Sequence, residues 1–153
     1  MKDQIVKAWQ IHQQMNIKLI NHTTDEAMQR LPAKQGRTIF QQWIHIHHVR
    51  MQWLEITARD IFAKHSVLDK NMPFDREVLE TSLDASATGL TNLFISSSDN
   101  AGRLKGFKNG LIPFLAYLIS HESHHRGNMV LTLKQSGEKL PDAIRWGLWE
   151  WGK

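Results

Sequence analysis

Hydrophobic residues recur at helical spacing in four long segments of the chain. The pattern predicts a first helix over about residues 3–21 and a second over about residues 38–64. A plain amphipathic stripe predicts a third helix over about residues 75–95, and a strongly apolar segment predicts a fourth over about residues 111–136. Four long helices with connectors of moderate length predict an all-α fold, a four-helix bundle.

Helix breakers separate these segments. Pro32 and Gly36 lie between the first and second segments, and Pro73 lies between the second and third. A polar stretch punctuated by Gly102 and Gly110 precedes the fourth. At 153 residues the chain has the size of one domain, so residues 1–153 are expected to form a single bundle with a short C-terminal helix.

The C-terminal segment, residues 141–151, is rich in tryptophan. If it forms one short helix, Trp146 and Trp149 fall on one side and Trp151 on another. One side can pack on the bundle while the other needs a partner, and aromatic residues are enriched in interface cores. The segment therefore predicts a homodimer.

Composition narrows the class of protein. Hydrophobic residues make up 41% and charged residues 22% of the chain, which favours a packed core over disorder. No apolar run approaches the roughly 18 residues that cross a bilayer, and the N-terminus lacks the pattern of a signal peptide. We expect a cytoplasmic protein with no membrane partner. The net charge of +4 is scattered, so no nucleic-acid partner is expected.

The chain has no cysteine and nine histidines. Disulfides, thiolate metal sites and cysteine nucleophiles are therefore excluded. Any transition metal must be held by histidine, with carboxylates or water completing the site.

A histidine pair interrupts the apolar stripe of the fourth segment. The stripe runs from Leu118 through His121 and His125 to Met129, so two imidazoles take positions where core residues are expected. Residues at i and i+4 lie on one helix face, which suits a shared metal ion. The alternative is a pair of ordinary core polar residues. Gly127, close to this pair, is expected to let a neighbouring helix approach.

A second histidine cluster lies far upstream, at His45, His47 and His48. Helix geometry does not decide which of them faces the pair, because His45 and His48 lie about 60° apart and His47 nearly opposite. The face of His45 and His48 also carries Gln41 and Gln52, either as the polar wall of a pocket or as an exposed strip.

Two polar residues interrupt the stripe of the first helix. His12 and Asn16 share a face with apolar residues near the middle of that helix. They either line a cavity beside the metal or are satisfied core hydrogen-bonding groups. Arg50 and Arg126 are expected to pair with carboxylates such as Glu122.

The segments His45–Leu54 and His121–Asn128, with the ending Gly147–Gly152, resemble the DinB family of metal-dependent helical-bundle proteins. The resemblance implies that His45, His121 and His125 hold one divalent metal, with zinc or nickel favoured. His48 is a reserve ligand, and His124 is a candidate to support the ligands from beside them.

The family also implies an activity. Its relatives include thiol transferases that use low-molecular-weight thiols and a thiol-dependent isomerase. A metal-dependent enzyme acting on a small molecule, a thiol transferase or a hydrolase, is therefore expected, with a low-molecular-weight thiol as a candidate cofactor. The alternatives are a non-catalytic metal-binding stress-response protein and a helical interaction module. Catalytic residues are not assigned, because Glu122 points about 100° away from His121.

Overall fold

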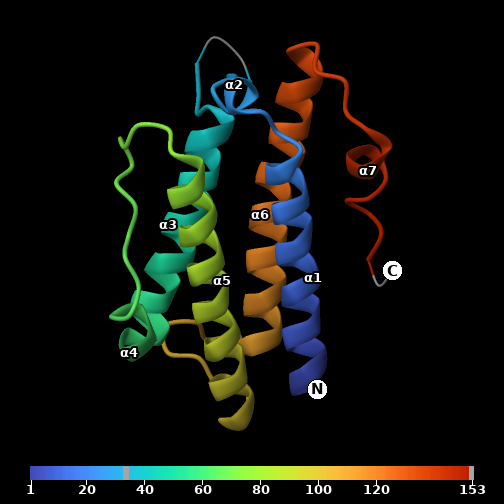
Figure 1. The fold of residues 1–153 in the computed structure, drawn as a ribbon. Coiled ribbons are helices and arrows are strands. Elements are labelled where there is room, and N and C mark those ends of the chain that lie inside the picture. Colours follow the sequence, from blue (N-terminus) through green and yellow to red (C-terminus); the bar gives the residue numbers. More distant parts are fainter. Residues whose placement is uncertain (33–34, 152–153) are drawn as a thin grey trace.

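Four long helices lie side by side in the computed structural model, with short helices between and after them (Figure 1). The structure describes residues 1–32 and 35–151. Within these ranges the long helices are α1 (Lys2–Asn21), α3 (Ile39–Thr57), α5 (Arg76–Asp99) and α6 (Leu111–Gln135). The short helices are α2 (Asp25–Met28), α4 (Arg59–Phe62) and α7 (Asp142–Arg145). None of these helices is both long and apolar enough to cross a bilayer.

The two helices that carry the histidine clusters, α3 and α6, pack directly against each other. The α5 helix packs against both α1 and α3, and α1 also packs against α6. The predicted all-helical fold is therefore confirmed, and side chains of α3 and α6 far apart in sequence can share one site.

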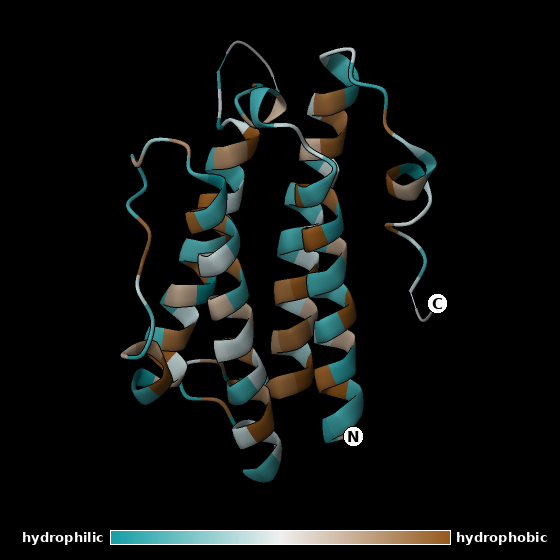
Figure 2. Cartoon of the chain, in the orientation of Figure 1, coloured by the Kyte–Doolittle hydropathy of each residue, from teal (hydrophilic) through white to brown (hydrophobic). Residues whose placement is uncertain are grey.

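The core is divided along the helix axes into two apolar clusters. One contains Leu19 of α1 and Trp43 of α3, and the other contains Trp9 of α1 and Leu54 of α3. Figure 2 shows apolar residues recurring along all four long helices, with polar residues between them. The buried Arg50 lies on α3 between Trp43 of the first cluster and Leu54 of the second.

The second predicted helix is interrupted, so the expectation of one helix over residues 38–64 is wrong. Thr57 ends α3, and Ala58 adopts φ −150° and ψ 72°, outside the helical region. The hydroxyl of Thr57 donates to the carbonyl oxygen of Trp53 at 2.6 Å. The bend lets Ile61 and Phe62 of α4 pack against the apolar cluster that contains Trp9.

The C-terminal segment also differs from the prediction. The α7 helix ends at Arg145, so Trp146 and Trp149 do not share the face of a longer helix. Both are exposed, at 62% and 82% of their surface. Ile144 is the residue that anchors this segment, because it is 1% exposed and belongs to the apolar cluster of Leu19.

Candidate metal centre

Three histidine rings converge where α3 meets α6. One ring nitrogen from each of His45, His121 and His125 lies within 4.8 Å of the other two. The ring centroids are 5.3 Å apart for His45 and His121, 4.9 Å for His45 and His125, and 4.8 Å for His121 and His125. All three residues are half-buried. The cluster therefore sits at the seam between two helices, within reach of solvent.

Local sequence fixes the start of the helix that carries His45. The hydroxyl of Thr38 accepts a hydrogen bond from the backbone N–H of Gln41, and the Gln41 side chain accepts one from the backbone N–H of Thr38. This capping box sets the first residue of α3 and hence the face on which His45 appears. On α6, the i, i+4 spacing puts His121 and His125 one turn apart on a single face.

Burial keeps the three imidazoles neutral. Desolvation is the main cause that lowers the pKa of His45 and of His125 to about 4, and it also lowers the pKa of His121. The positive charge of Arg37 adds to the effect on both His45 and His125. A neutral imidazole has a free lone pair at pH 7, which is the form that binds metal.

The donor set fits a divalent transition metal. Three neutral nitrogen donors suit zinc, nickel, copper or iron, whereas magnesium and calcium prefer oxygen. The Nδ1 atoms of His121 and His125 are buried without a hydrogen-bond partner among the described residues. Three protein ligands leave at least one coordination position for water or substrate, as in catalytic zinc sites. The three-histidine cluster can therefore hold a metal ion.

The other histidines nearby have different partners. Nε2 of His48 lies 2.6 Å from the carbonyl oxygen of Leu68, so this nitrogen carries the proton and donates it. The buried His47 makes a similar contact of 3.2 Å with the carbonyl oxygen of Ser66. His124 is exposed, with its ring centroid 5.4 Å from that of His125.

A buried ionic network lies beside the cluster, centred on Glu122 of α6. Arg50 of α3 donates to both carboxylate oxygens of Glu122, at 2.7 Å from Nε and 2.8 Å from Nη2. Nδ2 of Asn16 and Nε2 of His12, both on α1, each lie 2.8 Å from the same Oε2 atom. Arg126 donates to Asn16 at 2.6 Å. Nη1 of Arg50 also donates to the carbonyl oxygen of Leu83 on α5 at 2.9 Å, so the network links all four long helices.

Burial and the neighbouring charges determine which groups of this network are ionised. Burial alone would raise the pKa of Glu122, but the charge and hydrogen bonds of Arg50 hold it well below its usual range. Burial lowers the pKa of Arg126 to about 10 and also lowers the pKa of His12. Nδ1 of His12 faces a guanidinium nitrogen of Arg126 at 3.2 Å and must accept. His12 is therefore a neutral hydrogen-bonding group, and Glu122 is an ionised one.

The inward face of α6 differs from the predicted one. The buried positions after Leu118 are Glu122 and Arg126, with exposed fractions of 1% and 7%, whereas His121 and His125 lie about 100° round the helix at its edge. The paired charges replace apolar residues in the core stripe. The expected pairing of Arg50 with the Glu122 carboxylate is confirmed, but its position in the core was not predicted.

The residues proposed to line a pocket fall in three places. His12 and Asn16 are fully buried, and their polar atoms are used in hydrogen bonds of the network. Gln41 lies beside His45 in a pocket of about 240 Å³. Gln52 is exposed on α3. The structure therefore brings Gln41, and not His12 or Asn16, to the open side of the histidine cluster.

Two further features of the site were not predicted from the sequence. Tyr117 stacks on His121, with ring centroids 6.2 Å apart and an angle of 22° between the planes. Arg37 lines the pocket beside His45. The spacing of Tyr117 and His121, at i and i+4, was the available signal for the first contact. Arg37 precedes α3 and carries no helical signal.

Comparison with known proteins confirms the family resemblance. The family model described as DinB family matches residues 1–147. A protein of Bacillus subtilis (strain 168), named uncharacterized protein YrdA, is 24% identical over 163 aligned positions, which cover 99% of this chain and 92% of that protein. No solved structure matches the chain significantly.

Proposed function

Because the chain belongs to the DinB family, we propose that it is a metal-dependent enzyme of a four-helix-bundle fold, acting on a small molecule through His45, His121 and His125. The observation that carries the proposal is the convergence of three neutral imidazole nitrogens within 4.8 Å of one another. Zinc or nickel is the proposed ion, and its chemistry would be Lewis acidity at the open position, which lowers the pKa of a bound water or thiol.

The surrounding residues favour thiol transfer over hydrolysis. Hydrolysis needs a general base, and the adjacent carboxylate of Glu122 is occupied by Arg50, His12 and Asn16. A low-molecular-weight thiol has a pKa of about 8.5, which a metal would lower further, so it can lose its proton to solvent and react as the thiolate without such a base. The proposed reaction class is therefore transfer of a low-molecular-weight thiol to an electrophilic acceptor, with a hydrolase as the second candidate.

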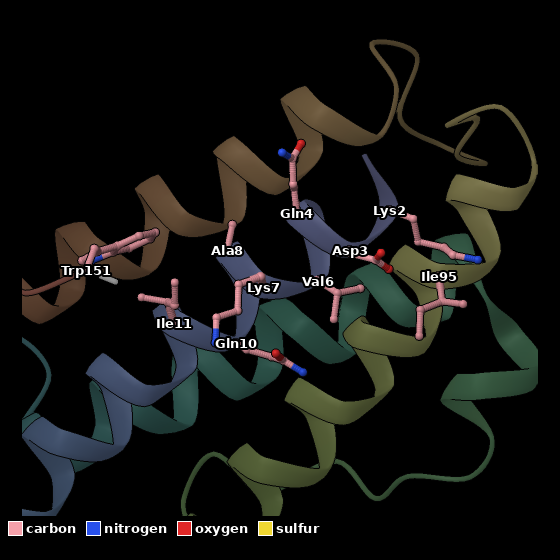
Figure 3. A pocket seen from close by; sticks show the side chains of 10 residues that line it. All are labelled: Lys2, Asp3, Gln4, Val6, Lys7, Ala8, Gln10, Ile11, Ile95 and Trp151. Atoms are coloured by element: carbon pink, nitrogen blue, oxygen red, sulfur yellow. The ribbon is translucent and has the colours of Figure 1, made fainter. Parts of the chain in front are cut away.

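A homodimer completes the proposal. Trp146 and Trp149 expose most of their surface. A pocket of about 930 Å³ follows α1, with Trp151 at one end and Ile95 at the other (Figure 3). No histidine lines this pocket, so it is separate from the proposed metal centre. Exposed aromatic surface of this kind supports a second copy of the chain as partner.

Metal content tests the centre directly. We expect one zinc or nickel ion per chain after loading, and a loss of bound metal in His45→Ala, His121→Ala and His125→Ala. His22→Ala is the matched control, because His22 is exposed and does not belong to the three-histidine cluster. If His48→Ala loses the metal while His45→Ala keeps it, the third ligand is His48. If none of these variants loses metal, the proposed centre is wrong.

Activity separates an enzyme from a metal-binding stress protein or an interaction module. The loaded protein is incubated with glutathione, cysteine or another low-molecular-weight thiol and a haloarene acceptor, and release of halide is measured. We expect turnover that disappears in His121→Ala. Full metal binding without turnover for any thiol, or ester and amide substrate, would favour the non-catalytic alternative.

A further inference from the structure

The pocket beside His45 is lined by positive charge, with no acidic side chain among its described lining residues. Its described lining includes Arg37 and Lys70, the amides of Gln41 and Asn71, and no aspartate or glutamate. His45 belongs both to this pocket and to the three-histidine cluster. The volume of about 240 Å³ lies below the range of about 300–1,000 Å³ typical of drug-sized ligands, and suits a small group of a ligand.

Neither cation is paired with a carboxylate in the part of the chain that the structure describes. Among the described residues, the side chains of Arg37 and Lys70 form no hydrogen bond or ion pair with a carboxylate. Asp69 is next to Lys70 in the chain, but its carboxylate accepts a hydrogen bond from the backbone N–H of Asn71 at 2.9 Å. Other arginines of this chain, such as the half-buried Arg30 and Arg76, do have acidic partners.

Arg37 lies on the pocket side of the histidine cluster, because Arg37 and His45 line the same pocket. The Gln41 side chain uses its oxygen to cap α3, which leaves its N–H₂ group as a donor toward the pocket.

We propose that this pocket binds an anionic oxygen group, a carboxylate or phosphate, of the ligand that reaches the histidine cluster. The inference rests on the proposed function and adds the charge of the substrate to it. Arg37 and Lys70 hold the anion as a non-reacting handle, while Gln41 and Asn71 supply neutral donors. Charge-assisted hydrogen bonds of this type are stronger than neutral ones and orient the group they bind.

Inorganic phosphate and acetate serve as probes in calorimetric titrations of the wild type and of the double variant Arg37→Gln/Lys70→Gln. The control is Lys64→Gln/Lys108→Gln, which removes the same net charge from exposed positions that do not line the pocket. Each protein is titrated with and without its metal, and metal content is measured first. Comparing the two probes shows which anion the pocket prefers.

We expect the Arg37/Lys70 variant to bind phosphate or acetate at least roughly 10-fold more weakly than the wild type, with unchanged metal content. The control should match the wild type in both measurements. Equal anion affinity in the variant and the wild type, in both metal states, overturns the inference. If the wild type takes up no metal, the proposed function fails, and the metal-free titrations still decide whether Arg37 and Lys70 form an anion site.

Discussion

Arg50 of α3 and Glu122 of α6 form a bidentate ion pair in the core, with donor–acceptor distances of 2.7 Å and 2.8 Å. Glu122 directly follows His121, and Arg50 lies on the same helix as His45. The pair therefore joins the two helices that carry the histidine cluster. Because the contact is short and directional, it fixes how α6 is rotated relative to α3, and with it the direction in which His121 points.

Removing the charge of the Glu122 carboxylate should lower the free energy of unfolding. Glu122→Gln leaves the buried Arg50 without its counterion, so we expect a loss of about 3–5 kcal/mol in the free energy of unfolding, measured with urea. Glu55→Gln, an exposed change on α3, should stay within about 0.5 kcal/mol of the wild type.

A double-mutant cycle with Arg50→Met separates the ion pair from other effects of the substitution. The double variant should be more stable than the sum of the single changes predicts, by about 1 kcal/mol or more. Strict additivity would mean that the pair is not coupled as the structure indicates.

The helices could be predicted from the sequence, but the inward face of α6 could not. Leu118, His121 and His125 follow a helical repeat, and so do Leu118, Glu122 and Arg126. Two charged residues on one helix face, such as Glu122 and Arg126, indicate a solvent-exposed face unless their partners on other helices are known. Arg50 was expected to pair with a carboxylate such as Glu122, and His12 and Asn16 were recognised as polar interruptions of the α1 stripe, but the local pattern does not show that all of them meet in the core.

The interruption after Thr57 had no local signal either. Neither proline nor glycine occurs between Thr57 and Arg59, so no breaker marks the end of α3. Packing of α4 on the core determines the bend. The pair His121 and His125 was, by contrast, accessible from its i, i+4 spacing. His45 was selected by the family resemblance alone, because helix geometry did not decide among the three upstream histidines.

Acidification should destabilise the metal-free protein between about pH 6.5 and pH 4. The pKa of buried His47 is lowered from 6.5 to about 4, mainly by desolvation. In that window the unfolded chain binds more protons than the folded one, so the free energy of unfolding decreases as pH falls, and this contribution levels off below about pH 4.

Urea unfolding at pH 7, 5.5 and 4.5 in the presence of a chelator measures the effect. Each such histidine contributes at most about 1.4 kcal/mol per pH unit. His47→Gln should reduce the slope, whereas His22→Gln, at an exposed position, should not. An unchanged slope in His47→Gln would show that His47 is not held neutral by burial.

Two glycines in long helices should respond oppositely to alanine. A Cβ atom at Gly127 of α6 would meet nothing within 4 Å, so the expected close helix approach at this position is wrong. A Cβ atom at Gly89 of α5 would lie 2.9 Å from Cδ1 of Leu54 and 3.0 Å from Nε2 of His65.

Gly127→Ala should therefore raise the free energy of unfolding by about 0.5–1 kcal/mol, because alanine loses less backbone entropy on folding. Gly89→Ala should lower it by about 1–3 kcal/mol, as overpacking of a core does. The urea midpoints of the two variants, compared with that of the wild type, measure these changes in the free energy of unfolding. Destabilisation by Gly127→Ala would mean that a partner covers this face of α6 in solution.

The exposed tryptophans near the C-terminus predict that the protein is a homodimer in solution. Trp146 and Trp149 are 62% and 82% exposed, and large apolar side chains so exposed commonly mark a partner surface. We expect sedimentation at micromolar concentration to give twice the chain mass of 17.7 kDa. Trp146→Ser/Trp149→Ser should shift the protein toward the monomer, because it removes two aromatic anchors. Val67→Ser, at an equally apolar position that is 52% exposed, should leave the dimer intact. A single species at the monomer mass for the wild type contradicts the dimer. A dimer that persists in the tryptophan variant means that the interface lies elsewhere. The α1 pocket of Figure 3 is then the next surface to substitute.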